Sequence, residues 1–552
     1  MPKSTAGSKS SKTPPGSSNP ARAGGGGGGG RKKQPRPAKA KGPRAAPAGW
    51  SGIAAALALA AFSAFAALWW FHRHGYLLHY GDAVAHLNIA RRLFDSRTPG
   101  YEQIGTVWLP LPHWIMSWFA RDDGWWRTGL AGGIPAALCQ TLAATFLFAA
   151  VRRAFSSTAA ALVALLLFLW NPNSAYLGSI PMTEPFFALA FAALCYFTVA
   201  GSAVGAGLAA CAGSLIRYDA WFVIPFVAAR FLWSHGPRPA LLFSVLAGAG
   251  PLYWFGHNAV YYGDPLEFYW GPWSAKAINQ RAVDAGMARY PGDHNWWAAL
   301  RQLRAAAWLD AGAPLAWLGL IGFLAMLAVK RAWVLAGLLT LPVFFYWLSI
   351  YSSGTPIFVP HLYPHSYYNT RYGLAALPLF AVGAAALVAI APGRLRAFAA
   401  ITVMAASLSP WILYPRMETW VTWKESQVNS EARRAWTGEA AEFLRANYRG
   451  GGILASFGDQ TGIFQQAGIP LVTTVHDGNS ALFFAQVYGR PEHFLHSRWI
   501  VALGGDAVSN AVRRARLRGP RYEVVKTIAV PNAPVVEIHR LVERFPRAAL
   551  RP

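Results

Sequence analysis

Charged residues are scarce in this chain, and that scarcity excludes a fully water-soluble protein. Asp, Glu, Lys and Arg make up 13% of the 552 residues, against roughly 25% in soluble proteins. Hydrophobic residues make up 54%. Apolar runs long enough to cross a bilayer as helices recur at 52–71, 130–151, 314–329, 333–350, 374–390 and 397–413. The sequence therefore predicts a polytopic α-helical membrane protein.

Cysteine is also nearly absent, which limits the covalent and metal chemistry available. The three cysteines, Cys139, Cys195 and Cys211, all fall in apolar helical stretches. That placement argues against a disulfide framework and against a cysteine metal site. No nucleotide-binding fingerprint occurs in the chain either.

The first fifty residues lack any acid, and they carry much of the formal net charge of +26. This tract is rich in Pro, Gly, Ser, Lys and Arg and includes seven consecutive glycines. It cannot bury enough apolar surface to fold, so we expect a disordered cytoplasmic tail at 1–50. Its positive charge is interpreted as a topological signal with some attraction to membrane lipid, not as a nucleic-acid site. The apolar segment that follows is too long and too deep in the chain for a cleavable signal.

Short loops that carry pairs of cations predict the orientation of the spans, because such loops stay in the cytoplasm. All of these loops fall on the cytoplasmic side if 203–233 crosses the membrane twice, with a break near Arg217–Asp219. About eleven spans result, with the C-terminus outside. The cationic loops contain Arg152–Arg153, Arg230 with Arg238, Lys330–Arg331, and Arg394 with Arg396. The expected spans are 51–71, 129–151, 158–172, 185–200, 203–216, 219–233, 240–256, 314–329, 333–350, 373–390 and 397–413.

Two kinds of segment are expected outside the membrane on this topology. Long outer loops at 72–128 and 257–313 are rich in aromatic residues, proline and charge. From about Arg416 the composition becomes that of a soluble domain, in which strand-like stretches alternate with helical ones. We therefore expect a small extracytoplasmic α/β domain at 416–552, after a transmembrane module at 51–413.

The first outer loop begins with YGDAVAHLNIARR, residues 80–92, which places ionisable groups directly after a span. In a helix Asp82 and His86 share one face, and an ionisable group at membrane depth marks a functional site by default. We therefore interpret Asp82 and His86 as functional residues, because they follow the span directly and lie at the mouth of any cavity that the helices form. The alternative is an interfacial helix whose charges meet water. For Arg91, Arg92 and Asp95 we favour that solvated arrangement, in which the arginines pair with Asp95.

Further ionisable residues are expected at the same membrane face. GSIPMTEPFF places Glu184 at the start of a helix, either as a site residue or simply as favourable charge at a helix N-terminus. SLIRYDAWF places Arg217 and Asp219 at the helix break, where a structural ion pair is the simpler account. NTRYGLAALP places Arg371 and Tyr372 at the outer end of a span, where a membrane-anchoring arginine is the alternative.

The order of these features resembles the GT-C superfamily of glycosyltransferases that use lipid-phosphate sugars. It is most similar to the bacterial family 39 group, which includes protein O-mannosyltransferases and aminoarabinose transferases. The resemblance covers roughly 51–413. It rests on GDAVAHLNIARR, GTVWLPLPHW, PMTEP, IRYDAW, YYGDPLEFYWG and NTRYGLAALP.

The resemblance implies transfer of a sugar from a polyprenyl-phosphate donor to a protein or glycolipid acceptor. The reaction is expected on the extracytoplasmic face of the bacterial cytoplasmic (inner) membrane, with Asp82 as general base. The implied catalytic group is Asp82, His86 and Glu184, with His86 as the candidate orienter of Asp82. The implied substrate-binding residues are Trp108, His113, Arg217, Lys276, Arg371 and Tyr372, with Arg371 first for the lipid phosphate.

Two departures from relatives bear on metal use. Asp82 is followed by Ala83, where several relatives carry a second acid, and Trp296–Trp297 is followed by Ala298 instead of the acid of metal-dependent oligosaccharyltransferases. We therefore expect no cofactor and no metal, with a divalent ion as the alternative. Two other function classes stay open: a transporter or flippase of a lipid-linked or small anionic substrate, and a non-catalytic assembly protein with the same fold.

Overall fold

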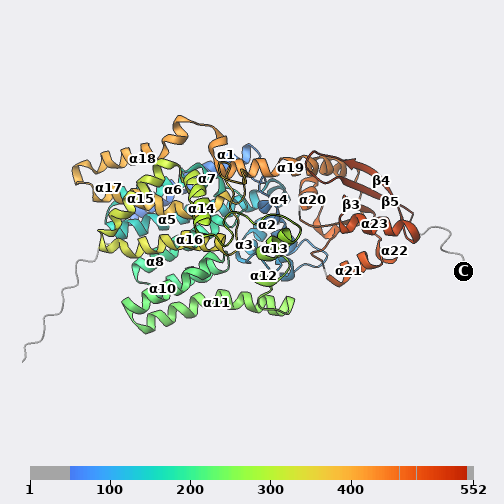
Figure 1. The fold of residues 1–552 in the computed structure, drawn as a ribbon, viewed down its shortest axis with the longest axis horizontal. Coiled ribbons are helices and arrows are strands. Elements are labelled where there is room, and N and C mark those ends of the chain that lie inside the picture. Colours follow the sequence, from blue (N-terminus) through green and yellow to red (C-terminus); the bar gives the residue numbers. More distant parts are fainter. Residues whose placement is uncertain (1–49, 459, 480, 544–552) are drawn as a thin grey trace, which may run out of the picture. The chain divides into compact units, whose positions relative to one another are not determined.

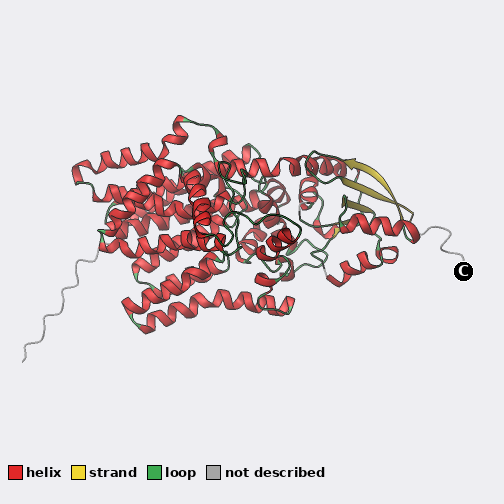
Figure 2. Ribbon diagram, in the orientation of Figure 1, coloured by secondary structure: helices red, strands yellow, loops and turns green. Residues whose placement is uncertain are grey.

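The computed structural model describes residues 50–543 except 459 and 480. The predicted disorder of the basic tract lies outside the described residues. Figure 1 follows the chain from α1 to β5, and Figure 2 shows that helices dominate until the strands near the C-terminus. The prediction of a mainly helical protein with several candidate membrane spans and a small C-terminal sheet domain is confirmed at this level.

A helix covers each of the apolar ranges predicted from the sequence. Their ends shift by a few residues, and the break expected near Arg217–Asp219 lies between α9 and α10. The helices are α1 (Trp50–Arg73), α5 (Leu130–Phe155), α6 (Thr158–Leu169), α8 (Glu184–Ala200), α9 (Ala203–Ser214), α10 (Asp219–His235), α11 (Pro237–Tyr262), α15 (Ala313–Leu327), α16 (Trp333–Tyr351), α17 (Leu377–Ile390) and α18 (Arg396–Leu413).

The count of about eleven membrane spans is not confirmed. Within the described part of the chain, 6 helical segments are long and apolar enough to cross a membrane. A seventh is reached if α14 (Trp296–Ala311) and α15, which meet at an angle of 109°, form one broken span. α6 and α9 have 12 residues each. At 1.5 Å per residue such helices are shorter than the ~30 Å hydrocarbon core, so they cannot be assigned as spans by length.

Consecutive helices are joined by tight connections that make them antiparallel neighbours. α5 ends at Ser156, α8 at Gly201 and α10 at Gly236, each with a positive φ, of 56°, 77° and 89°. Such caps reverse the chain within one or two residues. The predicted cationic loops therefore lie at one set of helix ends, and α2 (Gly81–Arg92), which carries Asp82, lies at the other.

Small residues let two of the apolar helices approach closely. A Cβ atom placed on Gly322 of α15 would overlap the backbone of Gly383 on α17, and one on Gly319 would meet the backbone of Phe380. Without a hydrophobic driving force between helices in lipid, close backbone approach of this kind is a main source of packing energy. The α15–α17 contact holds the start of α17, and with it the turn before it, in a fixed place.

Short helices gather at the helix ends that carry α2. They supply the side chains of the outer loops and cover the ends of the long helices. These elements are η1 (Tyr101–Ile104), α3 (Leu111–Phe119), α4 (Asp123–Thr128), α7 (Pro172–Leu177), α12 (Glu267–Trp270), α13 (Ala275–Asp284) and η3 (Thr370–Ala376). The remaining one-turn helices are η2 (Lys330–Ala332), η4 (Gly393–Leu395), η5 (Met417–Thr419) and η6 (Leu471–Thr473).

The C-terminal part begins with the long helix α19 (Val421–Asn447) and contains one five-stranded sheet in the order β2-β1-β3-β5-β4. β1 pairs in parallel with β2 and β3, whereas β5 runs antiparallel to β3 and β4. The strands are β1 (Ile453–Ala455), β2 (Thr474–Val475), β3 (Trp499–Leu503), β4 (Arg521–Ile528) and β5 (Val536–Glu543). The helices between them are α20 (Thr461–Ala467), α21 (Ala481–Gly489), α22 (Pro491–Phe494) and α23 (Ala507–Arg518).

The prediction that Arg91, Arg92 and Asp95 meet water is wrong, because these residues pack on the C-terminal domain. The Asp95 carboxylate accepts the backbone N–H groups of Leu471 (3.1 Å) and Val472 (2.9 Å). Arg91 pairs with Asp95 at 2.7 Å as expected, but both side chains are buried. The guanidinium of Arg92 does not pair with Asp95 and lies instead over a ring of the domain, that of Phe457. The domain is therefore docked on the helix that carries Asp82.

Candidate functional site

A cavity of about 450 Å³ lies at the helix ends that carry α2. It is bounded by α2, the starts of α8 and α10, α13, the end of α16 and η3. Eight of the nine residues predicted for the site line it: Asp82, His86, Trp108, Glu184, Arg217, Lys276, Arg371 and Tyr372. Residues from distant parts of the sequence thus meet around one space, as the sequence analysis predicted.

The start of α2 fixes Asp82 at the mouth of this cavity. Asp82 lies in the first turn of the helix, where a carboxylate is stabilised by the helix dipole. A Cβ atom on the preceding Gly81 would overlap the guanidinium of Arg433 from α19, so a larger residue there would require the Arg433 side chain to move. The side chain of Asp82 is 40% exposed, which makes it the most accessible carboxylate in the ion-pair cluster.

Arg371 of η3 ties three carboxylates together. Its Nη2 atom lies 2.5 Å from Asp82, its Nε atom 3.1 Å from Glu184 and its Nη1 atom 3.5 Å from Glu425. The side chain is 7% exposed, so the alternative of a membrane-anchoring arginine at the surface does not fit its position. All three nitrogens of the guanidinium contact an acid. Arg371 therefore positions carboxylates, and none of its guanidinium nitrogens is left free to bind a phosphate.

Arg217 forms the second half of the same network. It pairs with Asp219 at 3.4 Å, which confirms the predicted ion pair at the helix break, and with Glu184 at 3.3 Å. The ring of Tyr372 lies under the guanidiniums of both Arg217 and Arg371, at 5.2 and 5.0 Å. It also stacks on Tyr346 at 4.9 Å. Cation–π contacts hold both arginines in place.

Glu184 has a role that goes beyond helix capping. It begins α8, as predicted, and its Oε1 atom accepts from both Arg217 and Arg371. Its Oε2 atom is buried and accepts no hydrogen bond from any described residue. A buried carboxylate oxygen left without a donor is costly unless a ligand or water supplies one. This oxygen is therefore a candidate acceptor for a substrate hydroxyl.

Glu425 is the member of the cluster that the sequence analysis missed. It lies on α19, accepts the backbone N–H groups of Asn369 (3.0 Å) and Thr370 (2.7 Å), and also pairs with Arg371. Burial raises the pKa of its carboxyl above the usual value, and the nearby Arg371 opposes that rise. The only signal in the sequence was an acid soon after the last apolar span, within the part that was predicted to be a soluble domain.

His86 does not orient Asp82, contrary to the prediction. Its Nδ1 atom lies 2.9 Å from Nε2 of His113, whose Nδ1 lies 3.1 Å from the backbone oxygen of Leu109. The ring of Trp108 packs against His86 at a centroid distance of 4.2 Å. His113 is fully buried and does not line the cavity, so it supports His86 from behind and is not placed to touch a substrate.

The direction of hydrogen bonding in this histidine pair follows from its carbonyl end. A carbonyl oxygen only accepts, so His113 carries its proton on Nδ1 and offers Nε2 as an acceptor to Nδ1–H of His86. Burial lowers the pKa of His86 to about 3 and that of His113 well below its usual value, so both rings stay neutral. His86 is then left with an unprotonated Nε2 that has no hydrogen-bond partner within the described part of the chain. His86 is a hydrogen-bond acceptor in the cavity wall.

Lys276 is the cation of the cavity wall that contacts no carboxylate in the described structure. Its ammonium lies over the rings of Trp270 (4.6 Å) and Tyr269 (5.2 Å). Both rings and the lysine belong to the α12–α13 region, and all three side chains are exposed. A cation held by aromatic faces keeps its charge available to an anion.

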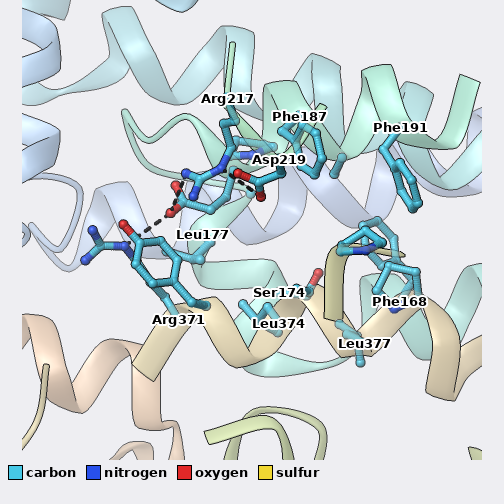
Figure 3. Close-up of a pocket in the computed structure, with 18 of the residues that line it drawn as sticks. Phe168, Ser174, Leu177, Phe187, Phe191, Arg217, Asp219, Arg371, Leu374 and Leu377 are labelled. Atoms are coloured by element: carbon cyan, nitrogen blue, oxygen red, sulfur yellow. Dashed lines mark hydrogen bonds and ion pairs between the residues drawn. The ribbon is translucent and has the colours of Figure 1, made fainter. Parts of the chain in front are cut away.

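A narrower cavity of about 90 Å³ continues from the ion cluster between the long helices. Figure 3 shows Arg217, Asp219 and Arg371 at one end of it, with Phe168, Phe191 and Leu377 at the other. The polar end is shared with the larger cavity, and the apolar end is formed by α6, α8 and α17. The site thus changes from charged to apolar within one continuous region.

No group of three or more His, Cys, Asp or Glu residues that could hold a metal ion is found among the described residues. The expectation of metal-independent chemistry stays a prediction. Comparison with protein-family models and with curated proteins found no match to this chain.

Proposed function

We propose that this membrane protein transfers a sugar from a polyprenyl-phosphate donor to a hydroxyl of a protein or glycolipid acceptor. The reaction is placed in the 450 Å³ cavity, on the extracytoplasmic face of a bacterial inner membrane. The observation that carries the proposal is the state of Asp82. Its carboxylate is held through Oδ2 by Arg371 and lines the cavity, and its Oδ1 atom makes no hydrogen bond to residues 50–543 as far as they are described.

A free carboxylate oxygen in this position suits a general base. It would take the proton of the acceptor hydroxyl as the hydroxyl oxygen forms a bond to the anomeric carbon. The bond from that carbon to the phosphate oxygen breaks, and polyprenyl phosphate leaves with the electron pair as an anion. Base catalysis of this kind contributes typically ~10²–10⁴-fold to rate. The acceptors Glu184 Oε2 and His86 Nε2 would bind sugar hydroxyl groups at the same time.

The charge distribution of the cavity supports an anionic leaving group. Arg217 and Arg371 are engaged by carboxylates, so Lys276 is the cation best placed to stabilise phosphate. The exposed aromatic residues around Lys276 suit a site that a lipid-linked donor reaches from the membrane interface. Trp108 offers a flat apolar face beside His86, as sugar rings require.

The proposal is tested by incubating the purified protein with radiolabelled polyprenyl-phosphate sugars and a membrane extract that supplies acceptors. Transfer of label to protein or glycolipid, together with release of polyprenyl phosphate, is the expected result. No transfer with any donor of a panel that varies the sugar would contradict it.

Transport of a lipid-linked or small anionic substrate is the second candidate. Breaks between α9 and α10 and between α14 and α15 place irregular backbone and charge beside a cavity, as in many transporters. Vesicles that carry the reconstituted protein and a fluorescent polyprenyl-phosphate sugar separate the two functions. A transporter moves the lipid between leaflets without cleaving it, whereas the proposed enzyme cleaves it and needs no exchange between leaflets.

A further inference from the structure

A second cavity, which shares no lining residue with the proposed active site, opens between α14, the α14–α15 bend and the end of α18. Its volume is about 590 Å³. Arg301 and Arg304 stand on α14, three residues apart, and both are exposed. None of the described lining residues is acidic. Neither arginine has an ion pair or a hydrogen bond to another described residue.

The walls of this cavity are aromatic. Trp308 packs edge-on against Trp317 and Phe380, which fixes one wall. Trp411 forms the other wall, with its ring against Gly312 at the bend, where a Cβ atom would lie 2.9 Å from the ring. Indole rings of this kind are common where a protein meets the headgroup region of a membrane.

The helix that borders the cavity has an exposed apolar surface. α18 is a candidate span, and only 11% of its apolar stretch is buried in the protein. Its last residues, Ile412 and Leu413, are 66% and 70% exposed, and Tyr414 follows at the cavity rim. A molecule in the cavity could therefore lay apolar chains along α18 while its polar part contacts α14.

We infer that this cavity binds the phosphate headgroup of an anionic phospholipid, with Arg301 and Arg304 as the phosphate ligands and α18 as the surface for its acyl chains. Two guanidinium groups in a cavity whose described lining contains no acid offer donors that match phosphate oxygens. Basic pockets between membrane helices are known to select acidic headgroups. The lipid is a structural one and not the reactive donor, because the cavity contains no carboxylate that could act as a base. The inference stands whether or not the chain is a glycosyltransferase.

The test measures lipid retention by native mass spectrometry after exchange into mixed micelles. The micelles contain phosphatidylcholine with phosphatidylglycerol, phosphatidylcholine alone, or phosphatidylcholine with undecaprenyl phosphate. We expect one tightly held phosphatidylglycerol, with affinity lowered tenfold or more by Arg301→Gln/Arg304→Gln. The double variant Arg238→Gln/Arg394→Gln removes two exposed cations from the opposite helix ends and should retain the lipid. Arg301→Lys/Arg304→Lys keeps the charge and should lose less than the glutamine variant.

Three results overturn the inference. The first is equal retention of phosphatidylglycerol by the parent and by a monodisperse Arg301→Gln/Arg304→Gln variant. The second is a preference for undecaprenyl phosphate that depends on the same arginines, since it would make the cavity a donor or product site. The third is displacement of the bound lipid by millimolar inorganic phosphate, which would show that the headgroup alone, without α18, accounts for binding.

Discussion

Arg371 Nη2 lies 2.5 Å from Asp82 Oδ2, although 289 residues separate the two in the chain. Asp82 belongs to α2, whose opposite face is docked on the C-terminal domain through Asp95. Arg371 belongs to η3, whose first backbone N–H groups are held by Glu425 of α19. The membrane helices and the C-terminal part therefore both determine where the proposed base lies, and changes far from the cavity should alter turnover.

Glu425→Gln should lower kcat by roughly 10–100-fold, because displacement of a reacting group by about 1 Å can lower the rate by up to about 100-fold. The amide cannot hold the N–H groups of η3 and the guanidinium of Arg371 as the carboxylate does. KM for the donor should change little, since Glu425 does not line the cavity. Steady-state kinetics separates the two effects. Glu418→Gln, at an exposed acid before α19, is the matched control, and an equal loss in both variants would refute the positioning role.

Asp95→Asn should lower stability by roughly 2–4 kcal/mol, because it breaks a buried, hydrogen-bonded ion pair. The expected readout is a lower midpoint of thermal unfolding and earlier protease cleavage at the start of the C-terminal domain. Asp284→Asn, at an exposed position of α13, should leave both unchanged. An unchanged midpoint in Asp95→Asn would show that the docking of α2 on the domain contributes little.

Lys276→Ala should raise KM for the lipid-phosphate donor about tenfold or more, since a hydrogen bond to a charged group contributes about 1.5–3 kcal/mol. Lys276→Arg should restore part of the affinity, and Arg281→Gln on the same helix serves as control. Arg371→Lys should act differently and lower kcat, because Arg371 holds Asp82 and Glu184. If only the Arg371 variant raises KM for the donor, the donor phosphate binds at Arg371, as was first predicted from the sequence.

The neutral histidine pair predicts how stability depends on pH. His86 has a pKa of about 3 in the folded protein, against roughly 6.5 in the unfolded chain. Below pH 6.5 the imidazole of residue 86 binds a proton in the unfolded state and not in the folded state. The contribution of His86 to stability is therefore present above pH 6.5 and is lost as pH falls towards 3. His86→Gln should reduce the slope of unfolding free energy between pH 6 and 4 by about 1.4 kcal/mol per pH unit. His496→Gln, at an exposed position, is the control, and equal slopes would show that His86 is protonated in the fold.

The sequence predicted where helices lie and which residues gather at one set of helix ends, because apolar run length and ionisable residues at helix ends are local signals. Glu184 at the start of α8 and Arg217 at the break before α10 are examples. The pairing of these residues was not predictable, since Asp82, Glu184 and Arg371 come from three distant segments. The sequence does not indicate which of several acids the guanidinium of Arg371 contacts. The number of spans stays open because a 12-residue helix such as α9 can be buried among longer ones.

The predictions that were wrong or missing have a common physical cause, which is packing between distant parts of the chain. Asp95 was expected in water because its neighbours in sequence are polar, but its partners Leu471 and Val472 lie more than 370 residues later. Glu425 was assigned to the soluble domain because the composition after about Arg416 is that of a soluble protein, and nothing local indicates contact with the distant Arg371. His86 was matched to Asp82 by helical spacing, whereas its partner is His113 on α3. Local spacing cannot rank such contacts.

The most direct test of the account is the turnover of Asp82→Asn with a radiolabelled polyprenyl-phosphate sugar that the parent protein uses. Asparagine preserves the shape of the side chain but cannot take a proton, so turnover should fall by about 10²–10⁴-fold. Donor affinity and the unfolding midpoint should stay near those of the parent, and Asp284→Asn should be fully active. Asp82→Asn that folds, binds donor and turns over at the rate of the parent would contradict the proposed role of Asp82 as general base.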